Sequence, residues 1–173
     1  LGVRHTARSG APRCASRGAT LVVEDCYIHD YLGSDPAIIF ADRAAAATVV
    51  RLRARNYYEL HFYETLTVVE DSLLELMIGD GIDFDNSPEG CVVRGCTIRG
   101  SSVWNVDAID FGVLFYPPGT ASRGLVEGCQ IHDITDKGLS VGEGAESVTI
   151  RDCLIHHVGI GLSAKDGSTV HAE

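Results

Sequence analysis

A short segment recurs five times along this chain and constrains its fold more than any other feature. The five copies are LVVEDCYIH (21–29), TVVEDSLLE (67–75), VVRGCTIR (92–99), LVEGCQIH (125–132) and TIRDCLIH (149–156). Apolar and polar residues alternate within each copy, and this alternation is the period of a β-strand. One short strand repeated along a chain of 173 residues predicts a solenoid.

The spacing of the copies indicates which kind of solenoid forms. One position of the repeat is occupied in turn by Cys26, Ser72, Cys96, Cys129 and Cys153, at intervals of 46, 24, 33 and 24 residues. These intervals correspond to turns of 23 or 24 residues with one insertion, and such periods suit a parallel β-helix or a leucine-rich repeat. The leucine-rich pattern is absent and no turn holds an amphipathic helix. The sequence therefore predicts an all-β fold, a parallel β-helix of about six coils.

The residues around this position predict which side chains face the core. Two apolar columns are expected to be buried: Val23, Val69, Val93, Val126 and Ile150, and Ile28, Leu74, Ile98, Ile131 and Ile155. The cysteines are expected to form a ladder of free thiols, because unpaired cysteine behaves as a small apolar residue. Between the columns, Glu70, Arg94, Glu127 and Arg151 alternate in sign, and stacked opposite charges attract.

Composition and charge limit the remaining possibilities. Residues 1–19 are basic and irregular, whereas residues 20–173 carry the repeat and are expected to form one β-helix domain. The pattern starts and stops within a repeat, so we expect a monomer or a piece of a longer chain. A net charge of −10 argues against nucleic acid as a partner. No run of 18 apolar residues exists, so the sequence predicts no membrane span.

A second repeat predicts an acidic outer face. Two further columns are expected to point inward: Ile38, Leu60, Ile82, Ile109, Leu139 and Leu162, and Phe40, Phe62, Phe84, Phe111, Val141 and Ala164. The residues between these columns must point outward, because strand side chains alternate. They are Ile39, His61, Asp83, Asp110, Ser140 and Ser163. In the second coil, at 44–63, Val49, Val50 and Leu52 are expected to form the first strand.

The acidic face is the strongest candidate for a functional site. Asp80, Asp83, Asp107 and Asp110 are expected on adjacent coils, with Asp85 close by, His61 on one side and Lys137 on the other. Like charges this close are destabilising unless something offsets them. A Ca²⁺ ion bound by the four aspartates would do so, and so would a shared proton, which creates an acid–base pair. The alternative is a solvated acidic face stabilised by Lys137 and bend amides.

Two weaker candidates lie elsewhere on the chain. Trp104, with the tyrosines at 57, 58 and 63, could form an aromatic platform for sugar rings, although such residues more often pack over bends. His29, His132 and His156 share one column and could bind a metal, but a solvated face is the favoured interpretation.

With both repeats in view, the chain resembles right-handed parallel β-helices of the pectate-lyase-like superfamily over about residues 20–170. The coil pattern V-x-I-x-x-N-x-I of those proteins occurs here with cysteine in place of the ladder asparagine. The segments GDGID, VDAID and DKGLSVG, and Ala164–Lys165, are similar to motifs of the polygalacturonases. This resemblance implies catalytic acids at Asp80 and Asp107, with Lys165 toward the substrate. Four departures separate the chain from that pattern: Gly79 stands for an asparagine, Val106 for an acid, Lys137 for a histidine, and an arginine is missing.

The polysaccharide lyases of the same superfamily are the other comparison. The resemblance to them implies a Ca²⁺ site and Lys137 as the base. Together the two resemblances lead us to expect an extracellular or cell-surface protein that binds or cleaves a polysaccharide, with uronates foremost. The expected catalytic residues are Asp80, Asp107, Lys137 and His61, and the expected substrate contacts are Asp85, Trp104 and Lys165. A non-catalytic structural or protein-docking module is the alternative. An enzyme is expected to show a groove along coils three to five, bounded by the insertion at 112–124.

Overall fold

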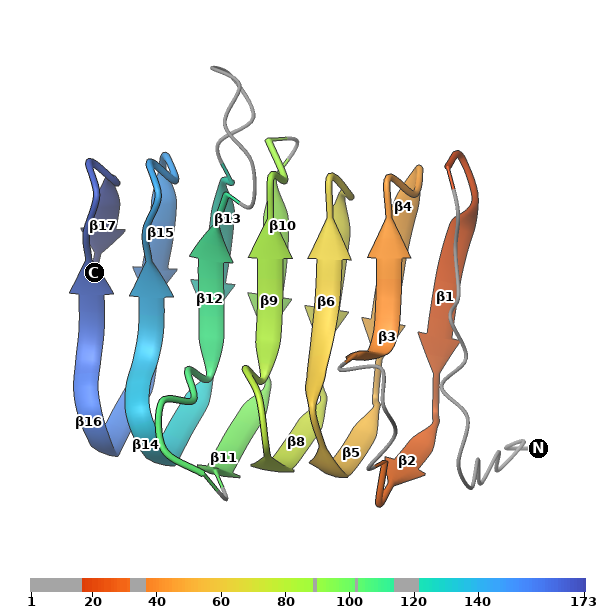
Figure 1. Ribbon diagram of the computed structural model, residues 1–173, viewed down its shortest axis with the longest axis horizontal. Helices are drawn as coiled ribbons and strands as arrows, with labels where there is room; N and C mark the ends of the chain where they lie inside the picture. The colour runs from red at the N-terminus through yellow and green to blue at the C-terminus, as the bar shows by residue number, and fades with distance from the viewer. Residues whose placement is uncertain (1–16, 32–36, 89, 102, 114–121) are drawn as a thin grey trace.

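The chain winds into a parallel β-helix, with successive coils stacked side by side along one axis (Figure 1). The computed structural model describes residues 17–31, 37–88, 90–101, 103–113 and 122–173. Of the basic segment at 1–19, residues 1–16 lie outside this description. Along the described residues every regular element is a strand, and no helix is present that could cross a membrane. Six coils are complete and a seventh begins with the last strand, in agreement with the predicted all-β solenoid.

Three faces build each coil. The first face consists of β1 (Thr20–Glu24), β4 (Ala46–Val50), β7 (Thr67–Glu70), β10 (Cys91–Arg94), β13 (Gly124–Glu127), β15 (Val148–Arg151) and β17 (Val170–Ala172). The second face begins with β2 (Tyr27–His29), β5 (Arg53–Tyr57), β8 (Leu73–Met77) and β11 (Thr97–Ser101). The third face begins with β3 (Ala37–Asp42), β6 (Glu59–Tyr63), β9 (Ile82–Asp85) and β12 (Ile109–Gly112). The long strands β14 (Gln130–Val141) and β16 (Leu154–Ala164) continue both of these faces around the bend.

The strand register confirms the predicted columns of the core. On the first face Val69, Val93 and Val126 are aligned and fully buried, as are Ile98 and Ile131 on the second. Ile155 extends the second column but is only partly buried, because the described chain offers β16 no partner other than β14. The first strand of the second coil contains Val49 and Val50 as predicted, with Val49 beside Val69, but it ends at Val50 and Leu52 is buried after it.

The cysteine column forms the expected ladder of thiols. The Sγ atoms of Cys96, Cys129 and Cys153 donate to the carbonyls of Val69, Val93 and Val126 on the preceding coil, at 3.6–3.7 Å. All five described cysteines are free. Each thiol of Cys96, Cys129 and Cys153 therefore packs as a small apolar side chain that also bonds to the preceding coil.

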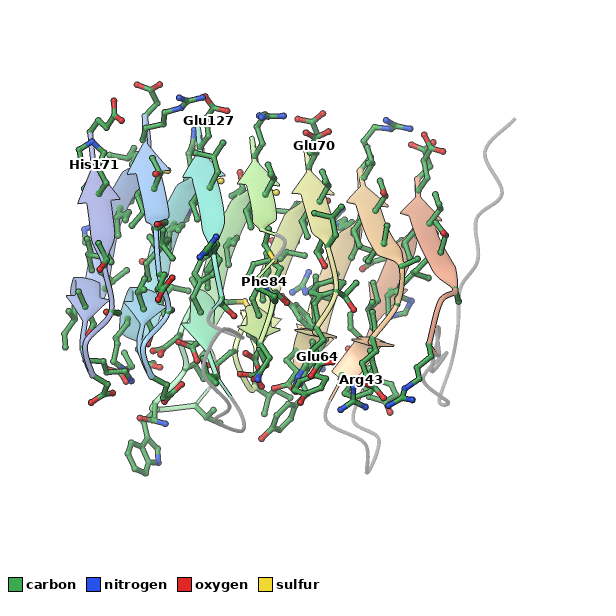
Figure 2. The ribbon with its side chains drawn as sticks, turned by 90° about the horizontal axis from the view of Figure 1, so that it is seen from above. Arg43, Glu64, Glu70, Phe84, Glu127 and His171 are labelled. Atoms are coloured by element: carbon green, nitrogen blue, oxygen red, sulfur yellow. The ribbon has the colours of Figure 1, made fainter. Side chains whose placement is uncertain are left out.

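The alternating charges of the first face pair as predicted. Arg94 lies between Glu70, at 2.7 Å, and Glu127, at 2.8 Å, and Arg151 contacts Glu127 at 2.6 Å. Figure 2 shows Glu70 and Glu127 along the same edge of the molecule. Because these groups are largely solvated, each pair contributes little to stability. The ladder helps to select the stacking register rather than to hold the coils together.

The register of the first coil differs from the prediction by one residue. Ile39, rather than Ile38, pairs with Leu60, because a bulge between Ala37 and Ile39 inserts an extra residue in β3. Such an insertion exchanges inward and outward positions in the rest of the strand. Phe40, predicted to be buried, therefore lies on the outer side, where its ring packs 5.1 Å from that of His61.

The bend after the first face uses a left-handed backbone in every coil. Asp25, Arg51, Asp71, Gly95, Gly128 and Asp152 occupy this position, with φ between 49° and 63°. Glycine adopts this conformation without the steric cost that a side chain imposes, and aspartate tolerates it better than most residues.

We expect Asp152→Gly to stabilise the fold by about 0.5–1 kcal/mol, because relief of left-handed strain exceeds the entropy that glycine adds to the unfolded chain. Asp152 is exposed, so little contact is lost. Urea unfolding of the variant and of the parent measures the difference. Thr149→Gly, placed within β15, is the matched control and should be destabilising; an Asp152→Gly variant less stable than the parent would contradict the strain argument.

Candidate functional site

The third face carries the predicted outward column across five coils, from the second to the sixth; in the first coil Ile39, predicted to point outward, is buried. His61, Asp83 and Asp110 lie side by side on β6, β9 and β12, and Ser140 and Ser163 continue the column on β14 and β16. Parallel pairing places each of these side chains about 4.8 Å from the next. The backbone therefore forces two aspartates together on the surface.

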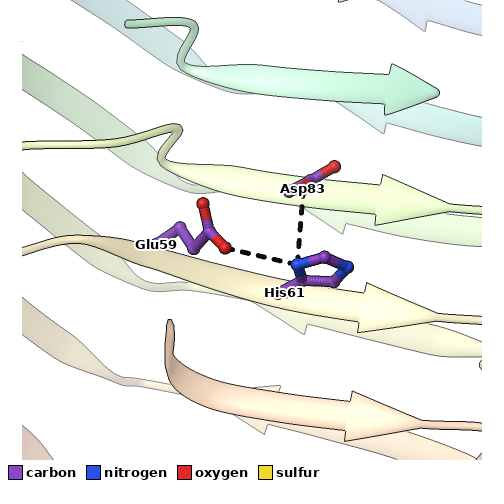
Figure 3. A group of neighbouring side chains, drawn as sticks. All are labelled: Glu59, His61 and Asp83. Atoms are coloured by element: carbon purple, nitrogen blue, oxygen red, sulfur yellow. Dashed lines mark hydrogen bonds and ion pairs between the residues drawn. The ribbon is translucent and has the colours of Figure 1, made fainter. Parts of the chain in front are cut away.

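His61 stands at the centre of a group of carboxylates. Its Nδ1 atom lies 3.2 Å from Glu59 Oε1 and 3.5 Å from Asp83 Oδ2 (Figure 3). Its Nε2 atom lies 3.5 Å from Asp85 Oδ2. Burial lowers the pKa of His61, but the neighbouring carboxylates of Asp85, Glu59 and Asp83 outweigh it and raise the pKa to about 10. Burial also raises the pKa of Asp83 well above its ordinary value, although His61 opposes this.

Asp80 and Asp107 form a capping ladder at the start of the third face. Asp80 Oδ1 accepts the backbone N–H of Asp107 at 2.8 Å, and Asp107 Oδ1 accepts that of Lys137 at 3.1 Å. The Lys137 ammonium also bonds Asp107, at 3.1 and 3.3 Å, and Asp136. Burial lowers the pKa of Lys137, but its bonds to Asp136 and Asp107 raise it above the ordinary value overall. A lysine held in this way is protonated at neutral pH and does not serve as a base.

Two aspartates of the face titrate near neutral pH. Burial raises the pKa of Asp80 to about 7, against the hydrogen bond from the Asp107 amide. Burial raises the pKa of Asp110 to about 6. A carboxyl group with such a pKa is partly protonated in the range where a general acid must act.

Three carboxylates surround Gly112, which lies two residues after Asp110 on β12 and shares its side of the strand. A methyl group added at Gly112 would lie 2.6 Å from Glu143 Oε2, 3.1 Å from Asp85 Oδ1 and 3.7 Å from Asp110 Oδ2. Only glycine leaves room for the three carboxylates to approach the backbone so closely. A set of carboxylate oxygens alone is the donor chemistry that Ca²⁺ prefers.

A basin adjoins the acidic column at the bend between the second and third faces. It has a volume of about 420 Å³ and is lined by Tyr58, Glu59, Ile78, Gly79, Asp80, Val103, Trp104 and Asn105. Trp104 is 85% exposed and Tyr58 is 41% exposed, so both rings are available to a ligand. Tyr57 and Tyr63, by contrast, are buried and take no part.

The basin exists because one coil is longer at this bend. Ile98 and Ile109 are 11 positions apart in the fourth coil, whereas Leu74 and Ile82 are 8 apart in the third. The extra residues carry Val103, Trp104 and Asn105 to the wall of the basin. A groove was predicted with the insertion at 112–124 as its boundary. The basin is instead bounded by 103–105, and most of that insertion, 114–121, lies outside the described residues.

The structure divides the predicted site residues into separate groups. Asp80 and Trp104 line the basin, whereas Asp107 and Lys137 pair with each other. Lys165 lies against Gly142, in the last complete coils of the β-helix. The four predicted Ca²⁺ ligands Asp80, Asp83, Asp107 and Asp110 do not gather. Within the described ranges, the one set of three ligand atoms all within 4.8 Å of one another comes from Glu59, His61 and Asp83.

Sequence reasoning overlooked two acidic residues that the structure brings to these sites. Glu59 precedes His61 by two residues and therefore shares its outward side, which strand alternation could have shown. Glu143 follows β14 in a turn, and its approach to Gly112 depends on the path of that turn, for which the sequence carries no signal.

These features define the chain as a β-helix solenoid with an acidic third face and an adjoining basin. The chain belongs to the right-handed β-helix family, because the model described as "Right handed beta helix region" matches residues 37–173. This confirms the predicted fold and handedness and agrees with the resemblance to the pectate-lyase-like superfamily. No curated protein matches the chain. Among solved structures, QnrB1, a plasmid-mediated fluoroquinolone resistance protein, aligns over 87% of this chain and 92% of its own, at 11% identity and a TM-score of 0.17. A likeness this weak carries no argument.

Proposed function

We propose that the basin beside the third face binds a polysaccharide and that Asp80 donates a proton to a glycosidic oxygen held there. One observation carries this proposal: Asp80, with a pKa raised to about 7, lines the same basin as the exposed rings of Trp104 and Tyr58. An acid that is partly protonated at neutral pH thus lies beside an aromatic surface.

The lining of the basin suits a sugar. Sugar rings present apolar C–H faces, which pack against aromatic side chains, and hydroxyl groups, which need polar partners. Trp104 and Tyr58 supply the first kind of contact, and Glu59, Asp80 and Asn105 supply the second. Such a chain would act where polysaccharides occur, outside the cell or at its surface.

Hydrolysis is favoured over elimination. A glycoside hydrolase needs one acid and a second carboxylate near the scissile bond. Asp80 and Glu59 both line the basin, and the hydrogen bond between His61 and Glu59 orients the second carboxylate. Asp107, the other acid implied by the polygalacturonase resemblance, is paired with Lys137 and does not line the basin. A lyase would need Lys137 as its base, and this lysine is paired with two aspartates.

The charge of the basin bears on the class of polysaccharide. The two carboxylates of the basin repel a uronate, so without a bound cation the basin fits a neutral polysaccharide. A uronate becomes compatible if Ca²⁺ draws together the oxygens of Asp85, Asp110 and Glu143, which are of the kind this ion prefers but do not all lie within 4.8 Å of one another. The ion would supply positive charge for the uronate carboxylate.

The test is incubation with neutral and uronate polysaccharides, with and without Ca²⁺, followed by assays for reducing ends and for unsaturated ends. We expect reducing ends without unsaturation. Asp80→Asn should lower the rate by about 10²–10⁴-fold, the usual contribution of a general acid, while binding persists. Asp152→Asn, an exposed substitution of the same kind, is the control and should retain the parent's rate. A fully active Asp80→Asn protein would exclude the proposed acid.

Binding is tested separately by Trp104→Ala. We expect affinity for the polysaccharide to fall by about 10-fold or more, since an exposed ring supplies most of the apolar contact. Leu66→Ala is the control, because Leu66 is 43% exposed and lies on another bend. Isothermal titration calorimetry reads both variants.

In parallel, Asp110→Asn should abolish any Ca²⁺-dependent binding of a uronate and leave binding of a neutral polysaccharide unchanged.

A non-catalytic module is the second candidate, and a specific observation favours it. The Asp80 and Asp107 carboxylates accept backbone N–H groups of the following coil, which is a structural role that needs no substrate. Binding without cleavage in the assays above would identify a carbohydrate-binding module. Neither binding nor cleavage would indicate a structural or protein-docking repeat.

A further inference from the structure

We propose that Glu59, His61 and Asp83 form a binding site for a divalent transition-metal ion, with Zn²⁺ as the reference ion. This site shares Glu59 with the sugar basin, and Asp85, which flanks His61, also lies near Gly112. The proposal rests on a different set of ligand atoms and does not depend on the proposed function. The ligand set is one imidazole nitrogen and two carboxylate oxygens.

The fold brings these three ligands together on rigid elements. Glu59 and His61 are two residues apart on β6, so strand alternation turns both to the same side. Asp83 is the residue paired with His61 on the neighbouring strand β9. Because all three stand within a regular parallel sheet, little ordering is needed when an ion binds.

The distances between the ligand atoms suit a small ion. Nδ1 of His61 lies 3.2 Å from Glu59 Oε1 and 3.5 Å from Asp83 Oδ2, and all three atoms lie within 4.8 Å of one another (Figure 3). Ligands bound to zinc at about 2.0–2.2 Å are separated by roughly 3–3.5 Å in tetrahedral or octahedral arrangements. The two separations from His61 therefore match the expected values, and the third, between Glu59 and Asp83, is within 4.8 Å.

Shielding from solvent distinguishes this group from an ordinary acidic surface. The side chains of Glu59, His61 and Asp83 are only 12%, 13% and 16% exposed, and the Phe40 ring covers the imidazole. Asp85 adds a third carboxylate. A single imidazolium balances one of these three charges, whereas a divalent ion offsets two. Carboxylates this well shielded are stabilised by cationic partners, and Arg43 is paired with Glu64 instead.

A further feature points to a ligand rather than to a self-contained ion pair. His61 Nε2 is buried and makes no hydrogen bond within the described part of the chain, while Asp85 Oδ2 lies 3.5 Å from it. A metal-bound histidine donates its other ring N–H to a carboxylate, which fixes the ring and strengthens it as a ligand. Metal on Nδ1, with Asp85 at Nε2, would give this arrangement and satisfy the orphaned nitrogen.

The imidazole also sets the class of ion. Nitrogen ligands favour Zn²⁺ and neighbouring transition metals, whereas Ca²⁺ and Mg²⁺ take oxygen ligands. We therefore expect the site to select Zn²⁺ over Ca²⁺. It is then separable by experiment from the oxygen-only group of Asp85, Asp110 and Glu143.

The second histidine cluster of the molecule must be removed first. The rings of His132 and His156 are stacked at 4.9 Å, and His156 Nδ1 lies 3.0 Å from His157 Nδ1, so these histidines could also take up zinc. The test protein therefore carries His156→Ala and His157→Ala, and both substitutions lie far from β6 along the stack of coils.

The experiment is titration of this chelator-treated protein with Zn²⁺ by calorimetry and with Co²⁺ by visible absorption. We expect one Zn²⁺ per chain, competition between Zn²⁺ and Co²⁺, and no displacement by millimolar Ca²⁺. His61→Ala should weaken Zn²⁺ binding by about 100-fold or more, and Glu59→Gln and Asp83→Asn by about 10-fold or more each. Ser163→Ala, in the same outward column on β16, is the control and should bind Zn²⁺ as the parent does.

Two outcomes would overturn the proposal: no Zn²⁺ uptake by the parent, or a folded His61→Ala variant that binds Zn²⁺ like the parent. Melting of each variant in chelator shows whether it folds, and His61→Gln replaces His61→Ala if the latter does not. Because metal uptake is measured without polysaccharide, failure here leaves the proposed sugar basin intact. Failure of the sugar assays likewise leaves the metal site intact.

Discussion

Replacing Phe84 with alanine is expected to destabilise the protein by about 3–5 kcal/mol, the usual range for loss of a buried aromatic side chain. Phe84 is fully buried on β9, and its ring lies 5.6 Å from that of Phe62 and 5.0 Å from that of Phe111. Figure 2 shows Phe84 well inside the stack of coils. Since both ring neighbours belong to rigid strands, the surrounding structure cannot collapse into the cavity. Guanidinium unfolding of the variant and the parent measures the loss.

Phe40→Ala is the matched control, because Phe40 occupies the outer side of β3 and is only partly buried. We expect this substitution to cost about 1 kcal/mol, within the ordinary range for point variants. Equal losses at Phe40 and Phe84 would show that the ring stack of Phe62, Phe84 and Phe111 is not the centre of the core.

Asp80→Asn is expected to stabilise the protein above pH 7 and to leave its stability unchanged near pH 4. The Asp80 carboxyl titrates near 3.8 in the unfolded chain, whereas burial raises its pKa to about 7 in the folded protein. Between these values the folded state keeps a proton that the unfolded state has lost, so stability falls as the pH rises. A difference of about three pH units corresponds to a loss on the order of 4 kcal/mol.

The asparagine variant isolates this effect. Its side-chain oxygen still accepts the Asp107 amide, so the hydrogen bond survives while the buried charge disappears. The other acidic groups of the face, Asp83, Asp110 and Glu59, are present in both proteins. Urea unfolding at intervals from pH 4 to pH 8, in chelator, should show the parent losing stability relative to the variant. Asp152→Asn, on an exposed bend, should follow the parent, and parallel curves for Asp80→Asn would contradict the buried-charge argument.

The sequence alone determined the architecture. Strand alternation and a repeat of 23 or 24 residues were sufficient to predict the inward columns of Val69 and Ile98, the cysteine ladder and the alternating charges of Glu70 and Arg94. These features depend on two local properties, the two-residue period of a strand and the stacking of equivalent positions. Both properties recur in each coil, so a position that is ambiguous in one coil is assigned from the equivalent positions in the other coils. The same logic correctly predicted the outward side of His61, Asp83 and Asp110.

The tertiary structure decided what happens where the repeat is interrupted. The bulge that turns Phe40 outward and the longer bend that presents Trp104 each occur in one coil only, so no neighbouring copy reveals them. The partners of the acidic residues also follow from the fold. Asp80 and Asp107 look alike in GDGID and VDAID, but one lines the basin and the other is paired with Lys137. Hydrogen bonds between coils, and the paths of individual bends, set those partners, and a pattern of residues along one strand contains no information about either.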